Sequence, residues 1–375
     1  MSSEEHDLTT ISGVKAYLEP THFKAADVHV LAGGHGNFTY RLFLQTPLDG
    51  RATVVMKHSK PYSATNPQFS LDLARQTFEA RALRQVSANV ASLPARVPAV
   101  HLFDEEKHVI IMDDAGTEST TLKSLFLSAN PPPASLARDI GSAIGQFLGR
   151  LHSWGSGNDA AMDEFAGNDL GKRITSWITY GMILPTLTTT EVPAVALLPE
   201  PVSASDLANL RALVEKRTDQ IHRARETLTM GDFWTGNIMV LLAGAQVDRI
   251  TVVDWELVKP GVAALDVAQF CAEMFAVVLF ADEGSVAQDS ARMLIDAFLT
   301  AYAGAYTVNR GVDGENRATV AARHLGAHLL TITTRYGWGS TAEETFRAVR
   351  TGLEYLQHGQ DEDWVRNKSI FAPLL

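Results

Sequence analysis

The chain has 375 residues, of which 46% are hydrophobic and 20% are charged. This composition is typical of a folded globular enzyme and excludes a disordered or fibrous chain, and the length suits two packed lobes rather than one small core. The 43 acidic residues exceed the 32 lysines and arginines and give a net charge of -11, which argues against a nucleic-acid partner held by a broad basic face.

The sequence contains one cysteine, Cys271, which excludes an internal disulfide and any multi-cysteine metal site. The acidic N-terminus has no apolar segment and does not resemble a signal peptide. The longest apolar run, residues 274–281, is too short to span a bilayer. These features predict a cytoplasmic protein with no membrane partner.

The first hundred residues are predicted to form mainly β-structure. Apolar and polar residues alternate through residues 37–46, which is the pattern of a half-buried strand. A turn sequence separates this strand from a second one at residues 52–57, and apolar runs at residues 99–103 and 108–112 complete a small antiparallel sheet. A helix is predicted at residues 70–87, because its apolar side chains fall on a helical stripe.

The chain changes character after Asp114. Three consecutive prolines precede a helix with one apolar face, and further helical stripes follow. We predict an α+β, bilobal fold with a small β-rich lobe at residues 1–113, a larger helical lobe at residues 114–375, and a ligand cleft between them. The predicted helices cover residues 135–152, 264–281, 287–306, 317–335 and 341–357, and an exposed loop is expected at residues 186–205.

Three glycines, Gly33, Gly34 and Gly36, precede Asn37 between two predicted strands. Glycine lets backbone N–H groups approach a phosphate without a Cβ in the way, so this segment is a candidate phosphate cradle. A glycine-rich hairpin turn without a ligand explains the pattern equally well, because glycine clusters are weak motifs.

Lys57 ends an otherwise apolar predicted strand. Its ammonium group either extends to solvent or contacts nucleotide phosphates. Glu79, on the predicted helix at residues 70–87, would orient Lys57 for the second role, as a Lys–Glu pair does in protein-kinase-like folds. The alternative for Glu79 is an exposed helix residue that pairs with Arg75, one turn earlier.

The strongest chemical signal comes from two polar clusters beside apolar segments. Asp232 and Asn237 lie five residues apart, and Asp254 and Glu256 follow an apolar strand. A phosphoryl transferase needs a carboxylate beside the acceptor hydroxyl, which Asp232 supplies, and oxygen ligands for Mg²⁺. Asn237, Asp254 and Glu256 fit the second need. The alternative is a polar loop and a capped strand end, but such carboxylates are costly to bury unless something binds them.

The sequence resembles the aminoglycoside phosphotransferase and choline kinase superfamily in the order of these motifs: the glycine-rich hairpin, the strand lysine, the helix glutamate, the D-x-x-x-x-N loop and the metal aspartate. The Leu-Gly-Arg-Leu-His segment at residues 148–152 also follows the family's order. The D-x-E metal motif and residues 54–62 are similar to the methylthioribose kinase branch. Within that branch the chain resembles the fungal kinases of the 4-hydroxytryptamine (psilocybin) kinase type.

This resemblance implies a protein-kinase-like fold and transfer of the γ-phosphoryl group of ATP to a hydroxyl of a small molecule, with ATP and Mg²⁺ as cofactors. ATP is expected between the lobes under residues 33–36, contacted by Lys57. Its adenine would bind backbone groups near Met112, Asp113 and Asp114. The resemblance places the acceptor near Trp234, His328, Arg335 and Trp338.

Two departures from the family's pattern concern activity and substrate. Met230 stands where many members have a histidine that braces the loop, but the fungal branch is similar here, so an active enzyme is expected. Thr334 replaces an acidic residue of that branch and Arg335 adds a positive charge, so a neutral, sugar-like acceptor is expected over a cationic arylamine. The alternatives are a 4-hydroxytryptamine kinase and a nucleotide-binding protein without turnover.

Overall fold

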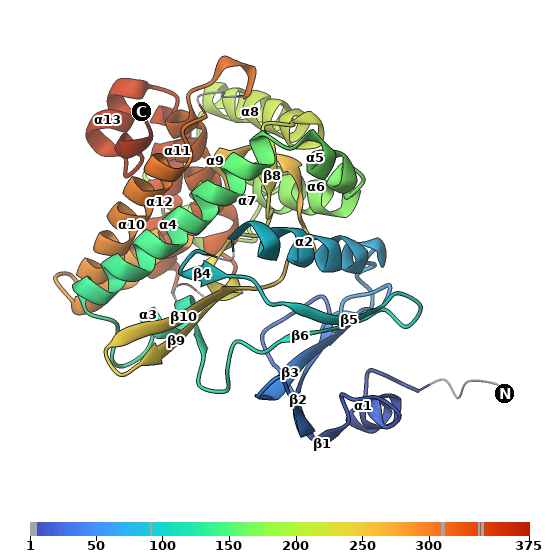
Figure 1. Cartoon of the computed structure of the whole chain (residues 1–375). Helices are drawn as coiled ribbons and strands as arrows, with labels where there is room; N and C mark the ends of the chain where they lie inside the picture. Colours follow the sequence, from blue (N-terminus) through green and yellow to red (C-terminus); the bar gives the residue numbers. More distant parts are fainter. Residues whose placement is uncertain (1–5, 91, 309–311, 337, 339–340) are drawn as a thin grey trace.

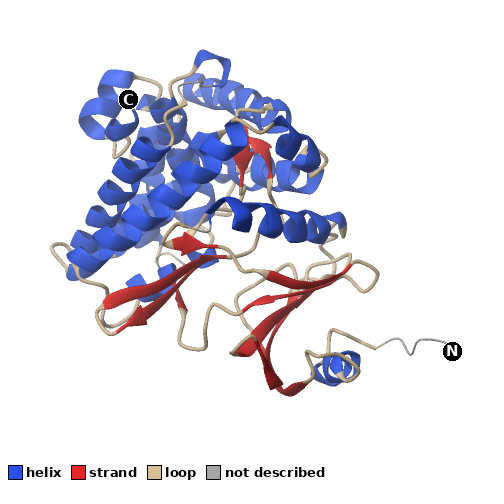
Figure 2. Ribbon diagram, viewed as in Figure 1, coloured by secondary structure: helices blue, strands red, loops and turns tan. Residues whose placement is uncertain are grey.

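The computed structural model describes residues 6–375 except 91, 309–311, 337 and 339–340. Most helices gather in one part of the molecule and the larger strands in another, with helix α2 (Ala74–Val90) between them (Figure 1). Helix α1 (Ile11–Leu18) lies at the sheet end, and α13 (Glu362–Lys368) lies at the far helical end. Figure 2 shows this segregation of helices and strands, which makes the fold α+β, as predicted.

A five-stranded antiparallel sheet forms most of the N-terminal part. Its strands are β1 (Ala25–Val30), β2 (Phe38–Leu48), β3 (Arg51–His58), β5 (Val100–Asp104) and β6 (Val109–Asp113). Their order in the sheet is β1-β2-β3-β6-β5, with each neighbouring pair antiparallel. The four predicted strands and the helix between them are confirmed, whereas β1 and α1 were not predicted.

Both faces of this sheet are buried. Val55 and Met112 face the larger hydrophobic core, which also contains α2 and the helical part. Val54 and Met56 face a second, smaller core beneath α1. Successive residues of a strand point to opposite faces, so an uninterrupted apolar run such as that of β3 is the pattern of a strand buried on both sides.

The long helices predicted for the second part of the chain are confirmed within a few residues at each end. One differs: the α-helix predicted at residues 317–335 ends at His328 and continues as a π-helical turn at Leu329–Thr333. These helices are α4 (Ala134–Ser156), α9 (Ala263–Phe280), α10 (Val286–Ala305), α11 (Arg317–His328) and α12 (Ala342–His358).

The exposed loop expected at residues 186–205 is wrong in part. The segment contains the end of α7 (Ile183–Thr188), a 3-10 turn at Pro193–Leu197 and the start of α8 (Ala204–Arg223). Val192 and Ala194 are buried, because the 3-10 turn packs against α12. Isolated small apolar residues among threonines and prolines gave no periodic signal for this contact.

Two smaller sheets position the polar segments of the second part. One has the strand order β4-β10-β9-β7 and the other the order β11-β8. The boundary between lobes after residue 113 stays a prediction. Strand β4 precedes this boundary and β7 follows it, yet both belong to the first of these sheets. The remaining elements are β4 (Ala95–Arg96), β7 (Thr120–Thr121), β8 (Thr227–Thr229), β9 (Ile238–Ala243), β10 (Gln246–Val252), β11 (Lys259–Gly261), α3 (Leu122–Phe126), α5 (Asp159–Phe165) and α6 (Asp169–Thr175).

Helix α9 is the central element of the helical part. It is long and apolar enough to cross a membrane by length and composition alone, but 78% of it is buried inside the protein. It packs against α10 and α11, which is the environment of a core helix. The predicted cytoplasmic location stays a prediction.

Helices α4 and α10 approach closely because three glycines lie four residues apart on α4. A methyl group added at Gly141 or Gly145 would lie 2.4 or 2.3 Å from the carbonyl oxygens of Leu294 and Phe298. At Gly149 it would lie 2.6 Å from a side chain of α10. Any larger side chain on this stripe must therefore push the two helices apart.

We expect Gly145→Val to destabilise the protein by about 1–3 kcal/mol, the usual cost of overpacking a core. Urea denaturation of the purified variant measures this change. The matched control is Gly304→Ala on α10, where an added methyl group meets no atom within 4 Å among the described residues; its stability should not fall. Equal stability of Gly145→Val and the parent would show that the two helices are not in this close contact.

Candidate active site

A buried ion cluster joins the large sheet to the helical part at the end of β3. Lys57 Nζ lies 2.8 Å from the Glu79 carboxylate on α2, and it also pairs with Asp254. Burial alone would lower the pKa of Lys57, but the carboxylates of Asp254 and Glu79 raise it above its usual value. Lys57 is thus charged and buried, and it does not extend to solvent.

Asp254 follows β10 in a conformation that is rare for this residue type. Its φ is 68°, in the left-handed region that non-glycine residues seldom adopt. Such a conformation persists only where the surroundings impose it, and it is concentrated at functional sites. Here it accompanies the contact between the Asp254 carboxylate and Lys57.

Glu256 is held by residues from the N-terminal part of the chain. Its Oε2 atom accepts hydrogen bonds from Asn37 Nδ2 at 2.8 Å and from Arg75 Nε at 3.1 Å. Arg75 also donates to the amide oxygen of Asn37 at 3.1 Å. The alternative pairing of Arg75 with Glu79 is therefore wrong, because Arg75 is buried against Glu256 instead of lying along the surface of its helix.

The glycine-rich segment connects β1 to β2 and covers the segment after β10. Gly33 has a φ of +110°, and both Gly33 and Gly34 have open space where a side chain would lie. A side chain at Gly36 would come within 2.8 Å of the Glu256 carboxylate. The loop therefore stays open beside Gly33 and Gly34 while it lies directly against Glu256.

The segment predicted to bind adenine consists of Met112 and Asp113, the last two residues of β6, and of Asp114, which follows the strand. Its carboxylates are occupied: Asp113 pairs with Arg51 at 2.9 Å, and Asp114 accepts a hydrogen bond from Arg41 Nε at 2.6 Å. Both carboxylates are thus engaged by arginines, so a base bound at this position would contact backbone groups and not these side chains.

Asp232 lies in the loop between β8 and β9, where two amides fix its carboxylate. Gln269 of α9 donates to Oδ1 at 2.8 Å, and Asn237 donates to Oδ2 at 3.1 Å. Burial, together with the negative charge of Asp254, raises the pKa of Asp232 to about 7. This carboxylate is therefore both oriented and more basic than an ordinary aspartate.

Asp266 of α9 holds the backbone of the same loop through hydrogen bonds. The Asp266 carboxylate accepts hydrogen bonds from the N–H groups of Met230 at 2.8 Å and Gly231 at 3.0 Å. His152 lies 3.2 Å from the same carboxylate. The loop is thus held through backbone groups, so a methionine side chain at position 230 is compatible with an ordered loop.

The acidic residues around Lys57 suit a hard metal ion. Glu79, Asp254 and Glu256 each offer a carboxylate oxygen, and these oxygens lie within 4.8 Å of one another. Asn237 uses its amide nitrogen on Asp232, which leaves its oxygen for another partner. An all-oxygen set of this kind matches the ligands of Mg²⁺. Of the four residues, only Glu79 was not predicted as a metal ligand, and it already pairs with Lys57.

Three of the four residues predicted near the acceptor converge on one place. Lys123 Nζ of α3 lies 4.3 Å from the ring centroid of Trp338 and 5.5 Å from that of Trp234. It also lies 3.4 Å from the Glu273 carboxylate, and His328 Nε2 lies 3.6 Å from the other oxygen of Glu273. Trp234, His328 and Trp338 thus surround a Lys–Glu pair.

Arg335 is the exception among the predicted acceptor residues. Its guanidinium group lies 3.3 Å from the Glu191 carboxylate and donates to the backbone oxygen of Thr331 at 2.8 Å. Its positive charge is therefore already compensated by an acidic side chain.

Residues 31–312 match the phosphotransferase enzyme family. The chain belongs to this family. It is 31% identical to the 4-hydroxytryptamine kinase of Psilocybe cyanescens over 98% of both chains. It is 26% identical to the methylthioribose kinase of Bacillus cereus, over 74% of this chain and 68% of that enzyme. A solved choline/ethanolamine kinase family protein from Mesorhizobium loti aligns with a TM-score of 0.48 and 14% identity, covering 96% of each chain.

The predicted family is therefore confirmed. The protein is a small-molecule phosphotransferase with an alcohol group as acceptor. The relation to the 4-hydroxytryptamine kinases extends over the whole chain, whereas the relation to methylthioribose kinase is more distant.

Three polar residues of this phosphotransferase were missed by the sequence analysis because they lie on the most apolar helix. Asp266, Gln269 and Glu273 are spaced three and four residues apart on α9, so they share one helical face. A polar stripe on a buried helix was the signal that could have revealed them, because buried polar groups need partners.

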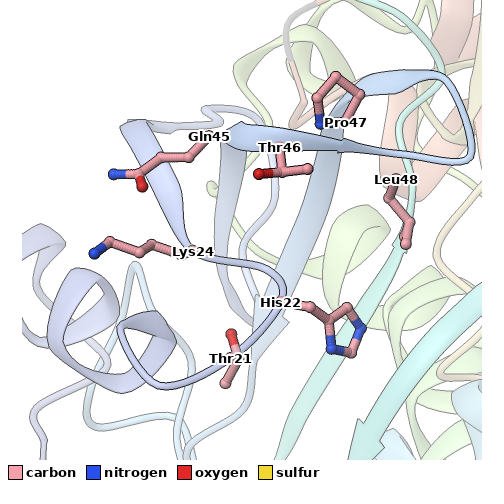
Figure 3. A pocket seen from close by; sticks show the side chains of 7 residues that line it. All are labelled: Thr21, His22, Lys24, Gln45, Thr46, Pro47 and Leu48. Atoms are coloured by element: carbon pink, nitrogen blue, oxygen red, sulfur yellow. The ribbon is translucent and has the colours of Figure 1, made fainter.

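A separate hollow lies away from Lys57, at the other end of the β2–β3 ladder. Lys57 is paired with Thr39 near the start of β2, whereas the hollow lies at the end of β2. It has a volume of about 360 Å³ and is lined by the segment before β1 and the end of β2 (Figure 3). Its lining consists of Thr21, His22, Lys24, Gln45, Thr46, Pro47 and Leu48. No carboxylate lies among these residues, so we do not assign the phosphoryl-transfer site to this hollow.

If this cluster holds Mg²⁺, replacing Asp254 with alanine should abolish Mg²⁺-dependent nucleotide binding, because it removes one of the carboxylates that would hold the ion. Calorimetric titration with Mg·ATP measures the loss. Asp248→Ala, at an exposed position of β10, is the matched control and should keep the parent affinity. An unchanged affinity of Asp254→Ala would place the metal elsewhere.

Proposed function

We propose that this phosphotransferase uses ATP and Mg²⁺ to phosphorylate a hydroxyl group of a small aromatic amine of the 4-hydroxytryptamine type. The observation that carries the proposal is the Asp232 carboxylate, which two amides orient and which lies within electrostatic range of Asp254. Phosphoryl transfer needs this combination of a carboxylate for the acceptor and an adjacent metal-binding acid.

In this proposal the ion cluster binds the nucleotide. Glu79 orients Lys57 toward the phosphates, and Asp254, Glu256 and Asn237 hold Mg²⁺. When bound, the metal offsets the negative charge of the phosphates. Three carboxylates gather here beside two cations, Lys57 and Arg75. Burial and the neighbouring acids raise the pKa of Glu79 to about 7, and a bound cation would stabilise the charged forms of these groups.

The remaining nucleotide contacts come from backbone groups. The open segment at Gly33 and Gly34 gives phosphates access to N–H groups without side chains in the way. Backbone groups of residues 112–114 would bind the adenine edge. Both assignments stay proposals, as does the catalytic role of Asp232.

Asp232 would orient the acceptor hydroxyl and accept its proton. Gln269 and Asn237 limit the Asp232 carboxylate to one orientation. A carboxylate with a fixed orientation can hold the acceptor hydroxyl in the position needed for reaction. Burial raises the pKa of Asp232 to about 7. A general base works best when its pKa lies near the working pH, so this pKa suits a reaction at neutral pH.

The expectation of a neutral, sugar-like acceptor depended on Thr334 supplying no negative charge and on Arg335 adding a positive one. The pairing of Arg335 with Glu191 removes the second of these two points. The similarity to 4-hydroxytryptamine kinases over 98% of the chain then favours a hydroxylated arylamine over methylthioribose. A nucleotide-binding protein without turnover is disfavoured, because such a protein has no need of the oriented Asp232.

We expect Asp232→Asn to fold and bind Mg·ATP but to lose phosphoryl transfer by about 10²–10⁴-fold, the usual contribution of a positioned general base. Steady-state assays and calorimetry on the same preparation separate the two effects. Asp248→Asn serves as the exposed aspartate control. Near-parental turnover in Asp232→Asn would remove Asp232 from the mechanism.

The acceptor assignment predicts that kcat/KM for 4-hydroxytryptamine exceeds that for methylthioribose by at least tenfold. Both acceptors should be compared at one saturating Mg·ATP concentration. A preference for methylthioribose would contradict the proposed acceptor class while leaving the kinase activity in place.

A further inference from the structure

The Lys–Glu pair between α3 and α9 has the chemistry of an ammonium-binding cage. The ammonium group of Lys123 contacts the Glu273 carboxylate at 3.4 Å. It also lies 4.3 Å from the ring centroid of Trp338 and 5.5 Å from that of Trp234. A carboxylate combined with aromatic faces at such distances is the arrangement by which proteins bind organic cations.

Glu273 needs a cation beside it to keep its negative charge. The Glu273 side chain is only 3% exposed, and burial raises its pKa while Lys123 opposes that shift. Its other neighbour, His328, is neutral, because burial lowers the pKa of His328 to about 3. In the described part of the chain, Lys123 is therefore the cation that compensates Glu273.

Two further buried groups are directed at Glu273. The hydroxyl of Thr235 and the indole N–H of Trp338 act on the Glu273 carboxylate as hydrogen-bond donors and lower its pKa. Trp338 is 4% exposed and Thr235 is 1% exposed. Donors directed at a carboxylate favour its charged form, which is the form that attracts an ammonium group.

Lys123 is the least fixed member of the cage. Its side chain is 20% exposed, in contrast to 3% for Glu273, and it lies on the five-residue helix α3. A lysine side chain is long and flexible, so its ammonium group can move into solvent without disturbing α9 or the two tryptophans.

The cage also lies at a suitable distance from Asp232, the proposed base for the acceptor hydroxyl. Gln269, which contacts Asp232, and Glu273 are four residues apart on α9. One such helical step is roughly 6 Å along the axis. A molecule with a hydroxyl at Asp232 and an ammonium at Glu273 therefore needs the two groups about one helical turn apart, as in a hydroxyarene with a short aminoalkyl chain.

We propose that Glu273, Trp234 and Trp338 bind the ammonium group of the acceptor, and that Lys123 occupies this cage until the acceptor displaces it. The identity of the acceptor rests on the proposed function. The cage is tested separately, by the binding of an amine that cannot be phosphorylated. Lys123 thus competes with the substrate cation, and Glu273 selects amines over neutral molecules.

The test uses calorimetric titration of the full-length protein with tryptamine, which has the amine but no hydroxyl to phosphorylate. N-acetyltryptamine is the neutral comparison. We expect tryptamine to bind at least tenfold more tightly than N-acetyltryptamine. Glu273→Gln should weaken tryptamine binding at least tenfold, and Lys123→Met should strengthen it at least threefold. Glu354→Gln, at an exposed position of α12, should leave it unchanged.

Three results would overturn the proposal: equal affinity for the two ligands, unchanged tryptamine binding by Glu273→Gln, or weaker binding by Lys123→Met. The comparison of ligands on the parent protein decides the matter even if Glu273→Gln does not fold. Phosphoryl transfer is measured separately. Expected tryptamine binding without transfer to any acceptor would refute the proposed function alone, and transfer without amine selectivity would refute the cage alone.

Discussion

The contact of Lys57 with Glu79 and Asp254 is the interaction on which the arrangement of this site depends. These three residues come from β3, from α2 and from the segment after β10, so one ammonium group connects the sheet, the intervening helix and the helical part. Removing Lys57 would leave the buried Glu79 carboxylate without its cation, which costs more than replacing the ion pair as a whole. The relative position of these elements is thus coupled to the ionisation of the site.

Arg75 and Asn37 extend this connection to the glycine-rich loop. Arg75 donates to Glu256 and to the backbone oxygen of Gly36 at 3.0 Å. The loop is consequently held at its β2 end, while Gly33 and Gly34 remain open. A loop with one fixed end can admit a ligand without loss of its contact to the acidic cluster.

Elements and motifs that depend on local pattern could be predicted from the sequence. Alternation along β2 and the helical stripes follow from backbone geometry, and Lys57, Asp232 and Asp254 stand in recognisable motifs. Contacts between distant segments could not be predicted: Arg75 and Glu256 lie 181 positions apart, so a partner one turn along the helix was the only local choice. The orientation of Arg335 was unpredictable for the same reason, since its partner Glu191 is remote in sequence.

Helix α9 shows how polar residues on a core helix can position a site. Asp266 holds the backbone of the loop that carries Asp232, Gln269 orients Asp232, and Glu273 pairs with Lys123. Because α9 is buried between other helices, its backbone fixes the spacing of these groups more rigidly than loops would. If Asp232 and Glu273 have the roles proposed for them, a substitution at position 273 would change the acceptor preference and preserve the chemistry at Asp232, since the two contacts arise from different turns of one rigid helix.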